Sequence, residues 1–208
     1  MSVFYYWVGC CWSELCWRTY LLTAMKNLLL LLGLLLGTSR AFAQLAPADE
    51  AAIRRTVQRI TANYIDHHFA DMATYTTPDV SWVNIVGMWW RGRAQVQQAH
   101  QAIFDTIFKG VPFTPGRATV RGLAPGVALV NLYCHTGAFY PPDGIDHGTN
   151  KEGEADDLLT LVLVKKQGNW LLAAGQNTVV RASAQPNNPV GKTSPPEPFD
   201  PAKLADLH

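Results

Sequence analysis

Three polar residues at alternate positions of one apolar segment are the first candidates for chemistry. Asn131, Tyr133 and His135 interrupt the apolar run between 127 and 136. A period of two places them on one face of a strand. Histidine titrates near neutral pH and can act as an acid or a base, and a tyrosine hydroxyl can stabilise an oxyanion. The sequence therefore predicts His135 and Tyr133 as the catalytic pair if the protein is an enzyme.

Further polar and aromatic residues in apolar surroundings extend this candidate site. The predicted ligand-binding residues are Trp82, Asn84, His100, Asn131, Thr160 and Asn177. Buried polar groups must find partners, so such residues line either a satisfied network or a ligand pocket. For His100, which lies in the apolar stripe of a predicted helix, we expect a packed histidine bonded to a backbone carbonyl.

Known signature motifs for cofactor chemistry are missing. The chain has no P-loop, no glycine-rich dinucleotide fingerprint, no G-x-S-x-G elbow and no HExxH motif. The acidic segment 140–157 does not have the alternation and closing glutamate of a calcium loop. We therefore expect neither a cofactor nor a metal.

Composition excludes other classes of partner. The 208 residues carry 17 basic and 16 acidic side chains, which leaves no broad cationic face for a phosphate backbone, so we expect no nucleic acid partner. An apolar content of 48% is enough for one core of ordinary size.

The first 43 residues differ from the rest of the chain. They follow the layout of a signal peptide. A basic start, Met25-Lys26-Asn27, precedes an apolar run from Leu28 to Leu36 and the small-residue cleavage pattern Ala41-Phe42-Ala43. The run is far shorter than the ~18 residues of a membrane helix, so we expect no stable membrane span. We predict a mis-annotated extension over 1–24, a signal peptide over 25–43 cleaved after Ala43, and a periplasmic or secreted protein.

Cleavage changes the composition of the predicted mature chain. Removing Glu14, Arg18, Lys26 and Arg40 leaves residues 44–208 with a net charge of −1, and only Cys134 remains of the four cysteines. A lone cysteine in an apolar strand is typical of a small buried hydrophobe, and the alternative is a nucleophile.

The remaining elements predict an α+β fold. Ile53, Val57, Ile60 and Tyr64 recur at helical spacing, and we expect helices over 50–69, 71–75 and about 93–108. Strands are predicted over 80–85, around 89–90, and over 114–123, 127–136, 158–166 and 170–180. The proline-rich segment 181–208 is predicted to be a disordered tail.

These elements and their motifs are similar to those of the nuclear transport factor 2-like superfamily. The resemblance rests on segments 81–87, Trp90-Arg91-Gly92-Arg93, 127–130, 160–164 and 174–178, and it covers about Asp49 to Val180. Within that superfamily the sequence resembles the SnoaL-like, SgcJ/EcaC-type group of domains of unknown function. The resemblance implies a cone domain over 44–180: a curved, mostly antiparallel sheet and three helices that enclose a pocket.

The resemblance also assigns positions within the cone. Ketosteroid isomerase, a distant relative, has its general base where this chain has Asn84, and its oxyanion donor aligns with Thr160. An amide cannot take a proton at neutral pH, so that isomerase chemistry is not supported. The same alignment implies that Asn131, Tyr133, His135 and Asn177 point into the cone. It implies that Val130, Leu132 and Cys134 face outward, where members of the superfamily dimerise.

Three functions fit these residues. The first is an exported domain that binds a small apolar or aromatic metabolite in a pocket lined by Trp, Asn, Tyr and His. The second is an isomerase, cyclase or dehydratase that uses His135 as acid or base; the oxidoreductase label of the SgcJ/EcaC group finds no residues here to hold a redox cofactor. The third is a non-catalytic interaction module that forms a homodimer through the outer sheet face.

Overall fold

A computed structural model of the chain describes residues 45–189. Two α-helices, α2 (Pro47–Asp66) and α3 (Arg93–Asp105), accompany one six-stranded sheet. The predicted helix at 71–75 is a single 3-10 turn, η1 (Met72–Thr74), so the fold has two α-helices rather than three. The extension 1–24, the signal peptide 25–43 and the tail beyond 189 lie outside the described residues. The start of the predicted tail contains a 3-10 helix, η2 (Ala182–Asn187).

The sheet follows the order β2-β1-β6-β5-β4-β3. Its strands are β1 (Thr76–Val83), β2 (Trp89–Arg91), β3 (Phe113–Ala124), β4 (Val127–Thr136), β5 (Ala155–Lys166) and β6 (Asn169–Val179). All neighbours are antiparallel except β1 and β6, which are parallel. The α+β fold with a curved sheet is therefore confirmed.

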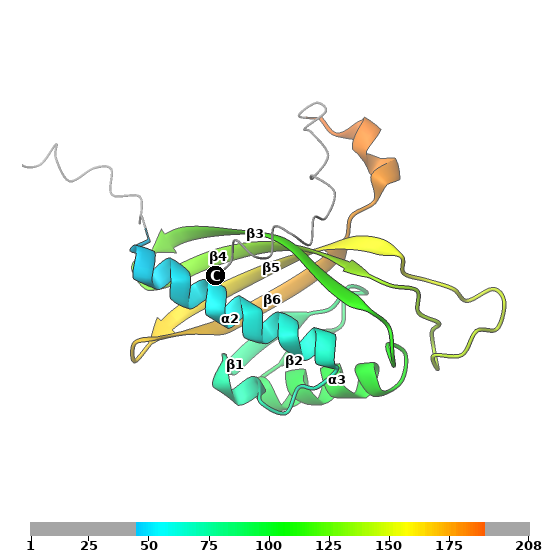
Figure 1. Cartoon of the computed structure of the whole chain (residues 1–208), viewed down its shortest axis with the longest axis horizontal. Coiled ribbons are helices and arrows are strands. Elements are labelled where there is room, and N and C mark those ends of the chain that lie inside the picture. The colour runs from blue at the N-terminus through cyan, green and yellow to red at the C-terminus, as the bar shows by residue number, and fades with distance from the viewer. Residues whose placement is uncertain (1–44, 190–208) are drawn as a thin grey trace, which may run out of the picture. The chain divides into compact units, whose positions relative to one another are not determined.

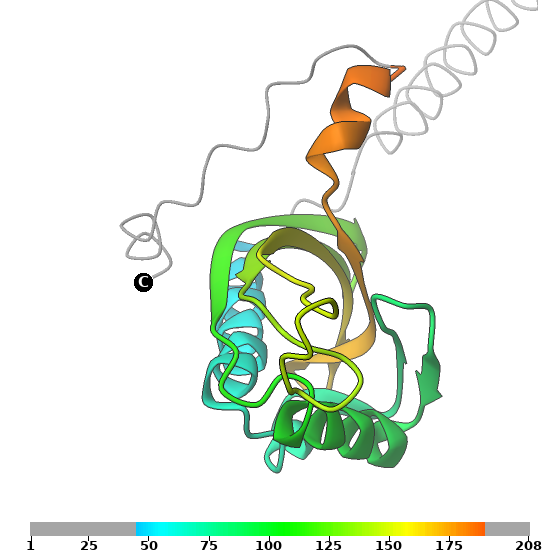
Figure 2. The same cartoon turned by 90° about the vertical axis from the view of Figure 1, so that its right-hand side faces the viewer.

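The sheet curls around an interior that the helices cover. Figure 2 looks along this interior, with α2 on one side, α3 below it and the segment 137–154 across the open end. Helix α2 packs on β6 and β3, and α3 packs against β1 and β2 (Figure 1). Ile53, Val57 and Ile60 form the buried stripe of α2, as their spacing predicts.

The two faces of β4 are the reverse of what the resemblance implied. Val130, Leu132 and Cys134 are buried in the core, and Leu132 is only 1% exposed. Because side chains alternate along a strand, Asn131 and His135 lie on the outer face. Apolar side chains gain most free energy on the covered side, and a shift of one position in the alignment moves every side chain to the other face. The expectation that Val130, Leu132 and Cys134 face outward was wrong.

Candidate functional site

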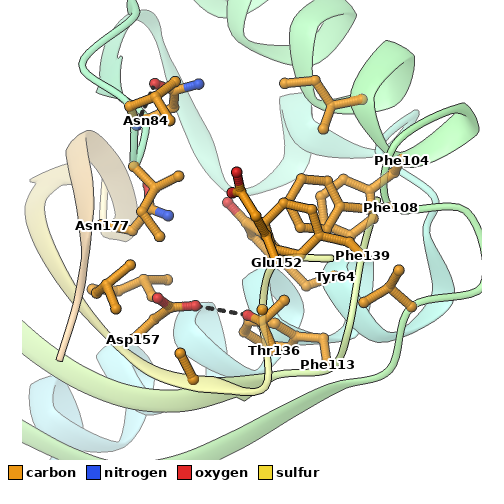
Figure 3. A pocket seen from close by; sticks show the side chains of 18 of the residues that line it. Tyr64, Asn84, Phe104, Phe108, Phe113, Thr136, Phe139, Glu152, Asp157 and Asn177 are labelled. Atoms are coloured by element: carbon orange, nitrogen blue, oxygen red, sulfur yellow. Dashed lines mark hydrogen bonds between the residues drawn. The ribbon is translucent and has the colours of Figure 1, made fainter. Parts of the chain in front are cut away.

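A cavity of about 460 Å³ lies between the concave face of the sheet, α3 and the segment 137–154. This volume is in the range of sites for small organic molecules. Aromatic side chains form one wall: Tyr64, Trp82, Trp90, Phe104, Phe108, Phe113 and Phe139. The polar lining residues are Asn84, His100, Thr136, Glu152, Asp157, Asn177 and Arg181. In Figure 3, Asn84, Asn177 and Asp157 lie on the side of the cavity opposite the phenylalanines.

The half-buried Tyr64 of α2 and the buried His100 of α3 form a hydrogen-bonded pair in this lining. His100 Nδ1 lies 2.8 Å from the Val96 carbonyl oxygen, and Nε2 lies 2.8 Å from the Tyr64 hydroxyl. A carbonyl only accepts, so Nδ1 carries the proton and Nε2 accepts from the Tyr64 hydroxyl. Burial lowers the pKa of His100 to about 4, which keeps the ring neutral at pH 7. The expected bond from His100 to a backbone carbonyl is confirmed.

Trp82 reaches the cavity because its neighbour on β6 is a glycine. Trp82 pairs with Gly175 in the parallel register of β1 and β6. A Cβ atom on Gly175 would lie 2.1 Å from Cζ3 of the Trp82 ring, a distance that no packed side chain could accept. The ring therefore lies directly on the backbone of β6, and it meets the His100 ring at 5.0 Å between centroids.

The turn between β1 and β2 positions Asn84 at the cavity. Its Oδ1 accepts hydrogen bonds from the backbone N–H groups of Val86 at 3.1 Å and Met88 at 2.8 Å. Gly87, with φ of +83°, supplies the left-handed residue that this turn needs. These two bonds fix the amide so that Nδ2 is the group left to donate to a ligand (Figure 3).

Of the polar lining residues that the sequence analysis did not predict, Thr136, Glu152, Asp157 and Arg181, the most deeply buried is Asp157. It is 5% exposed and lies in the inward-facing row of β5, and its Oδ2 accepts a 2.7 Å hydrogen bond from the Thr136 hydroxyl. Burial raises the pKa of its carboxyl, an effect that the Thr136 bond partly opposes. The predicted strand at 158–166 left Asp157 in the acidic loop. The signal available was its position two residues before Leu159, in phase with the buried leucines.

The structure brings together only half of the predicted site. Trp82, Asn84, His100 and Asn177 line the cavity. Asn131, Tyr133, His135 and Thr160 do not, so the expectation that Asn131, Tyr133 and His135 point into the cone was wrong. On the outer face, Asn131 Nδ2 donates to Thr160 Oγ1 at 3.1 Å, and His135 Nδ1 lies 3.0 Å from Asp156 Oδ1. Cys134 is buried, and burial raises the pKa of its thiol.

Residues 45–189 contain no group of three or more His, Cys, Asp or Glu side chains placed to hold a metal ion. Over the same residues, no helix is both long enough and apolar enough to cross a bilayer.

Comparison with known proteins places this fold. The SnoaL-like domain family matches residues 53–179. A solved structure of an uncharacterized protein with a cystatin-like fold from Caulobacter vibrioides is 37% identical, with a TM-score of 0.62, over 67% of this chain and 94% of that one. No curated protein matches the sequence.

Two more distant structures share the fold alone. A domain of unknown function from Nostoc punctiforme is 21% identical, with a TM-score of 0.55, over 68% of this chain and 83% of that one. A protein from Streptomyces avermitilis, described as a proposed dehydratase of the nuclear transport factor 2-like family, is 18% identical, with a TM-score of 0.53, over 66% of this chain and 100% of that one.

Proposed function

The chain belongs to the SnoaL-like domain family of the nuclear transport factor 2-like superfamily, and from this premise we propose that it binds a small, largely aromatic molecule in its cavity. One observation carries the proposal: the 460 Å³ cavity combines a wall of aromatic rings with buried polar groups that have no partner among residues 45–189. Aromatic walls supply contact area, and a few polar groups fix the orientation of a ligand.

A neutral aromatic probe tests this proposal directly. N-phenyl-1-naphthylamine, followed by its own fluorescence and by quenching of Trp82 and Trp90, is expected to bind saturably at one site per chain. Phe104→Leu removes part of the aromatic wall and should weaken binding several-fold, by the roughly 1 kcal/mol of an aromatic contact. Tyr133→Leu is the matched change on the outer face and should leave binding unchanged. Absence of saturable binding to the unaltered protein would overturn the proposal.

The enzymatic alternative now depends on a different residue. His135 lies on the outer face, and His100 has both ring nitrogens engaged and a pKa of about 4, so neither is placed to transfer a proton in the cavity at pH 7. Asp157 favours the alternative, since a buried carboxyl with a raised pKa suits an acid or base in an isomerase, cyclase or dehydratase. Mass spectrometry of a bound molecule before and after incubation separates binding from conversion.

We also propose that the protein is exported and cleaved after Ala43. The support is the sequence of residues 25–43, which lies outside the described part of the chain. Sequencing the N-terminus of the protein recovered from the periplasm or medium should give Gln44 as the first residue. An N-terminus before residue 44 would contradict this.

Self-association through the outer sheet face is a further proposal. Val130, Leu132 and Cys134 cannot contribute, because they are buried inside. Leu129 and Val162 face each other across β4 and β5 on the outer face and are half-buried in the single chain. Light scattering should give the mass of a dimer, and Val162→Arg should reduce it to a monomer by placing a charge in an apolar contact.

A further inference from the structure

Two buried side-chain oxygen atoms in the cavity lining have no hydrogen-bond partner among residues 45–189. They are Asp157 Oδ1 and Asn177 Oδ1. The other oxygen of Asp157 is held by the Thr136 hydroxyl at 2.7 Å, which fixes the carboxyl against β4. Such orphaned groups cost free energy in a folded protein, so their presence in a cavity points to a missing partner.

The strand register makes the two residues that carry these oxygens diagonal neighbours on the sheet. In the antiparallel pairing of β5 and β6, Asp157 lies opposite Val179 and Leu159 lies opposite Asn177. Asp157 and Asn177 are therefore diagonal neighbours on the inner face, about 7–8 Å apart, and one small ligand can contact both. Figure 3 shows them on the same side of the cavity, facing the aromatic wall.

Asp157 has no ion-pair partner among residues 45–189, although Arg181 also lines the cavity. The immediate charged neighbour of Asp157 is Asp156, which points to the outer face and pairs with His135, and Glu152 adds a second carboxyl to the cavity. Asp157 Oδ1 therefore lacks a hydrogen-bond donor. A ligand group that can only accept hydrogen bonds would not stabilise this oxygen.

We propose that Asp157 and Asn177 form the polar subsite of this cavity and that it binds a hydrogen-bond donor, a hydroxyl or an amine, carried on an aromatic skeleton. The inference rests on the proposed binding function and specifies its ligand class. The ring of the ligand lies against Phe104, Phe108 and Phe139, and its donor reaches across to the sheet (Figure 3). Asp157 decides the selectivity, because the Asn177 amide can rotate to present either its oxygen or its nitrogen, whereas a carboxylate can only accept.

Three probes with one skeleton test this assignment. 1-Naphthol and 1-naphthylmethylamine carry donors, and 1-methoxynaphthalene carries none. At least one donor probe is expected to bind the unaltered protein about tenfold more tightly than the methyl ether, as a hydrogen bond to a charged group allows. The probe that shows the preference tells a hydroxyl ligand from an amine.

Substitutions at Asp157 then assign the preference to this carboxyl. Asp157→Leu should bring the donor probes within about twofold of the methyl ether, while leaving the binding of the ether intact. Asp157→Asn, which keeps the shape and an acceptor, should retain part of the preference for 1-naphthol and lose that for the amine. Asp156→Leu removes the adjacent carboxyl from the outer face. It should change neither the preference for the donor probes nor the binding of the methyl ether. Thermal unfolding verifies that each variant is folded.

The possible failures are distinct. If all three probes bind the unaltered protein equally, the subsite assignment is wrong and the binding function stands. If the donor preference survives in both Asp157 variants, Asp157 is not the acceptor and the assignment is equally wrong. If no probe binds, the proposed function and the inference fail together.

Discussion

The polar residues on the two faces of strands β4 and β5 differ in whether they have hydrogen-bond partners. On the outer face, polar groups satisfy one another: Asn131 bonds to Thr160, and His135 bonds to Asp156. On the inner face, Asp157 is 5% exposed yet has one oxygen without a partner, as has Asn177 on the adjacent strand. Both sets interrupt apolar strands, so their sequence patterns look alike.

The difference lies in what surrounds each set. Polar groups that are paired across neighbouring strands and partly hydrated need no ligand to complete them. A buried carboxyl with one oxygen left without a hydrogen-bond partner costs free energy, which a ligand can recover. The candidate site of this domain is therefore marked by unsatisfied polar groups and not by polar residues as such.

The largest change in stability is expected when one side chain on each face of β4 is truncated. Leu132→Ala should destabilise the fold by about 2–5 kcal/mol, because it leaves a cavity at a position that is only 1% exposed. Asn131→Ala, one position along, should cost less than about 1 kcal/mol. Urea unfolding of both variants provides the measurement, and equal losses would contradict the assignment of the two faces.

A second test compares two of the six histidines, His100 inside the domain and His135 on the outer face. The pKa of His100 in the folded chain is about 4, below the ordinary value of 6.5, so between these values the unfolded chain binds more protons. Stability should therefore fall by about 3 kcal/mol as the pH is lowered from 6.5 to 4.

The histidine variants separate this effect from other acid titrations. His100→Gln should flatten the fall in unfolding free energy measured between pH 7 and pH 4. His135→Gln, at a side chain that is 43% exposed, should leave the fall as steep as in the unaltered protein. A fall that is equally steep in both variants would show that His100 is not responsible for it.

The smallest expected effect belongs to the outer ion pair. His135 and Asp156 are 43% and 64% exposed in their side chains, and exposed pairs contribute about 0–1 kcal/mol. Asp156→Asn and His135→Ala, alone and combined, should change the unfolding free energy by no more than that and leave probe binding unchanged. A tenfold loss of probe binding in His135→Ala would restore the outer face as a functional site.

Local sequence patterns predicted most of the fold. The apolar spacing of Ile53, Val57 and Ile60 identifies α2, and the predicted strand 127–136 coincides with β4. The predicted α-helix at 71–75 was wrong, because only a 3-10 turn forms over Met72–Thr74. Trp82, Asn84, His100 and Asn177, four of the predicted site residues, line one cavity, and their role in ligand binding stays a prediction.

The sequence by itself determined the periodicity of each element, because that depends on neighbours within a few positions along the chain. It contained the period of two on β4 but not which of its two faces is covered by α2 and the curled sheet. Only the tertiary structure decided this, since a one-position shift exchanges Leu132 for Tyr133 as the inward residue. The same packing placed Asp157 near Asn177 and opposite the phenylalanines. Asp157, which the sequence analysis assigned to a polar loop, therefore lies in the candidate site.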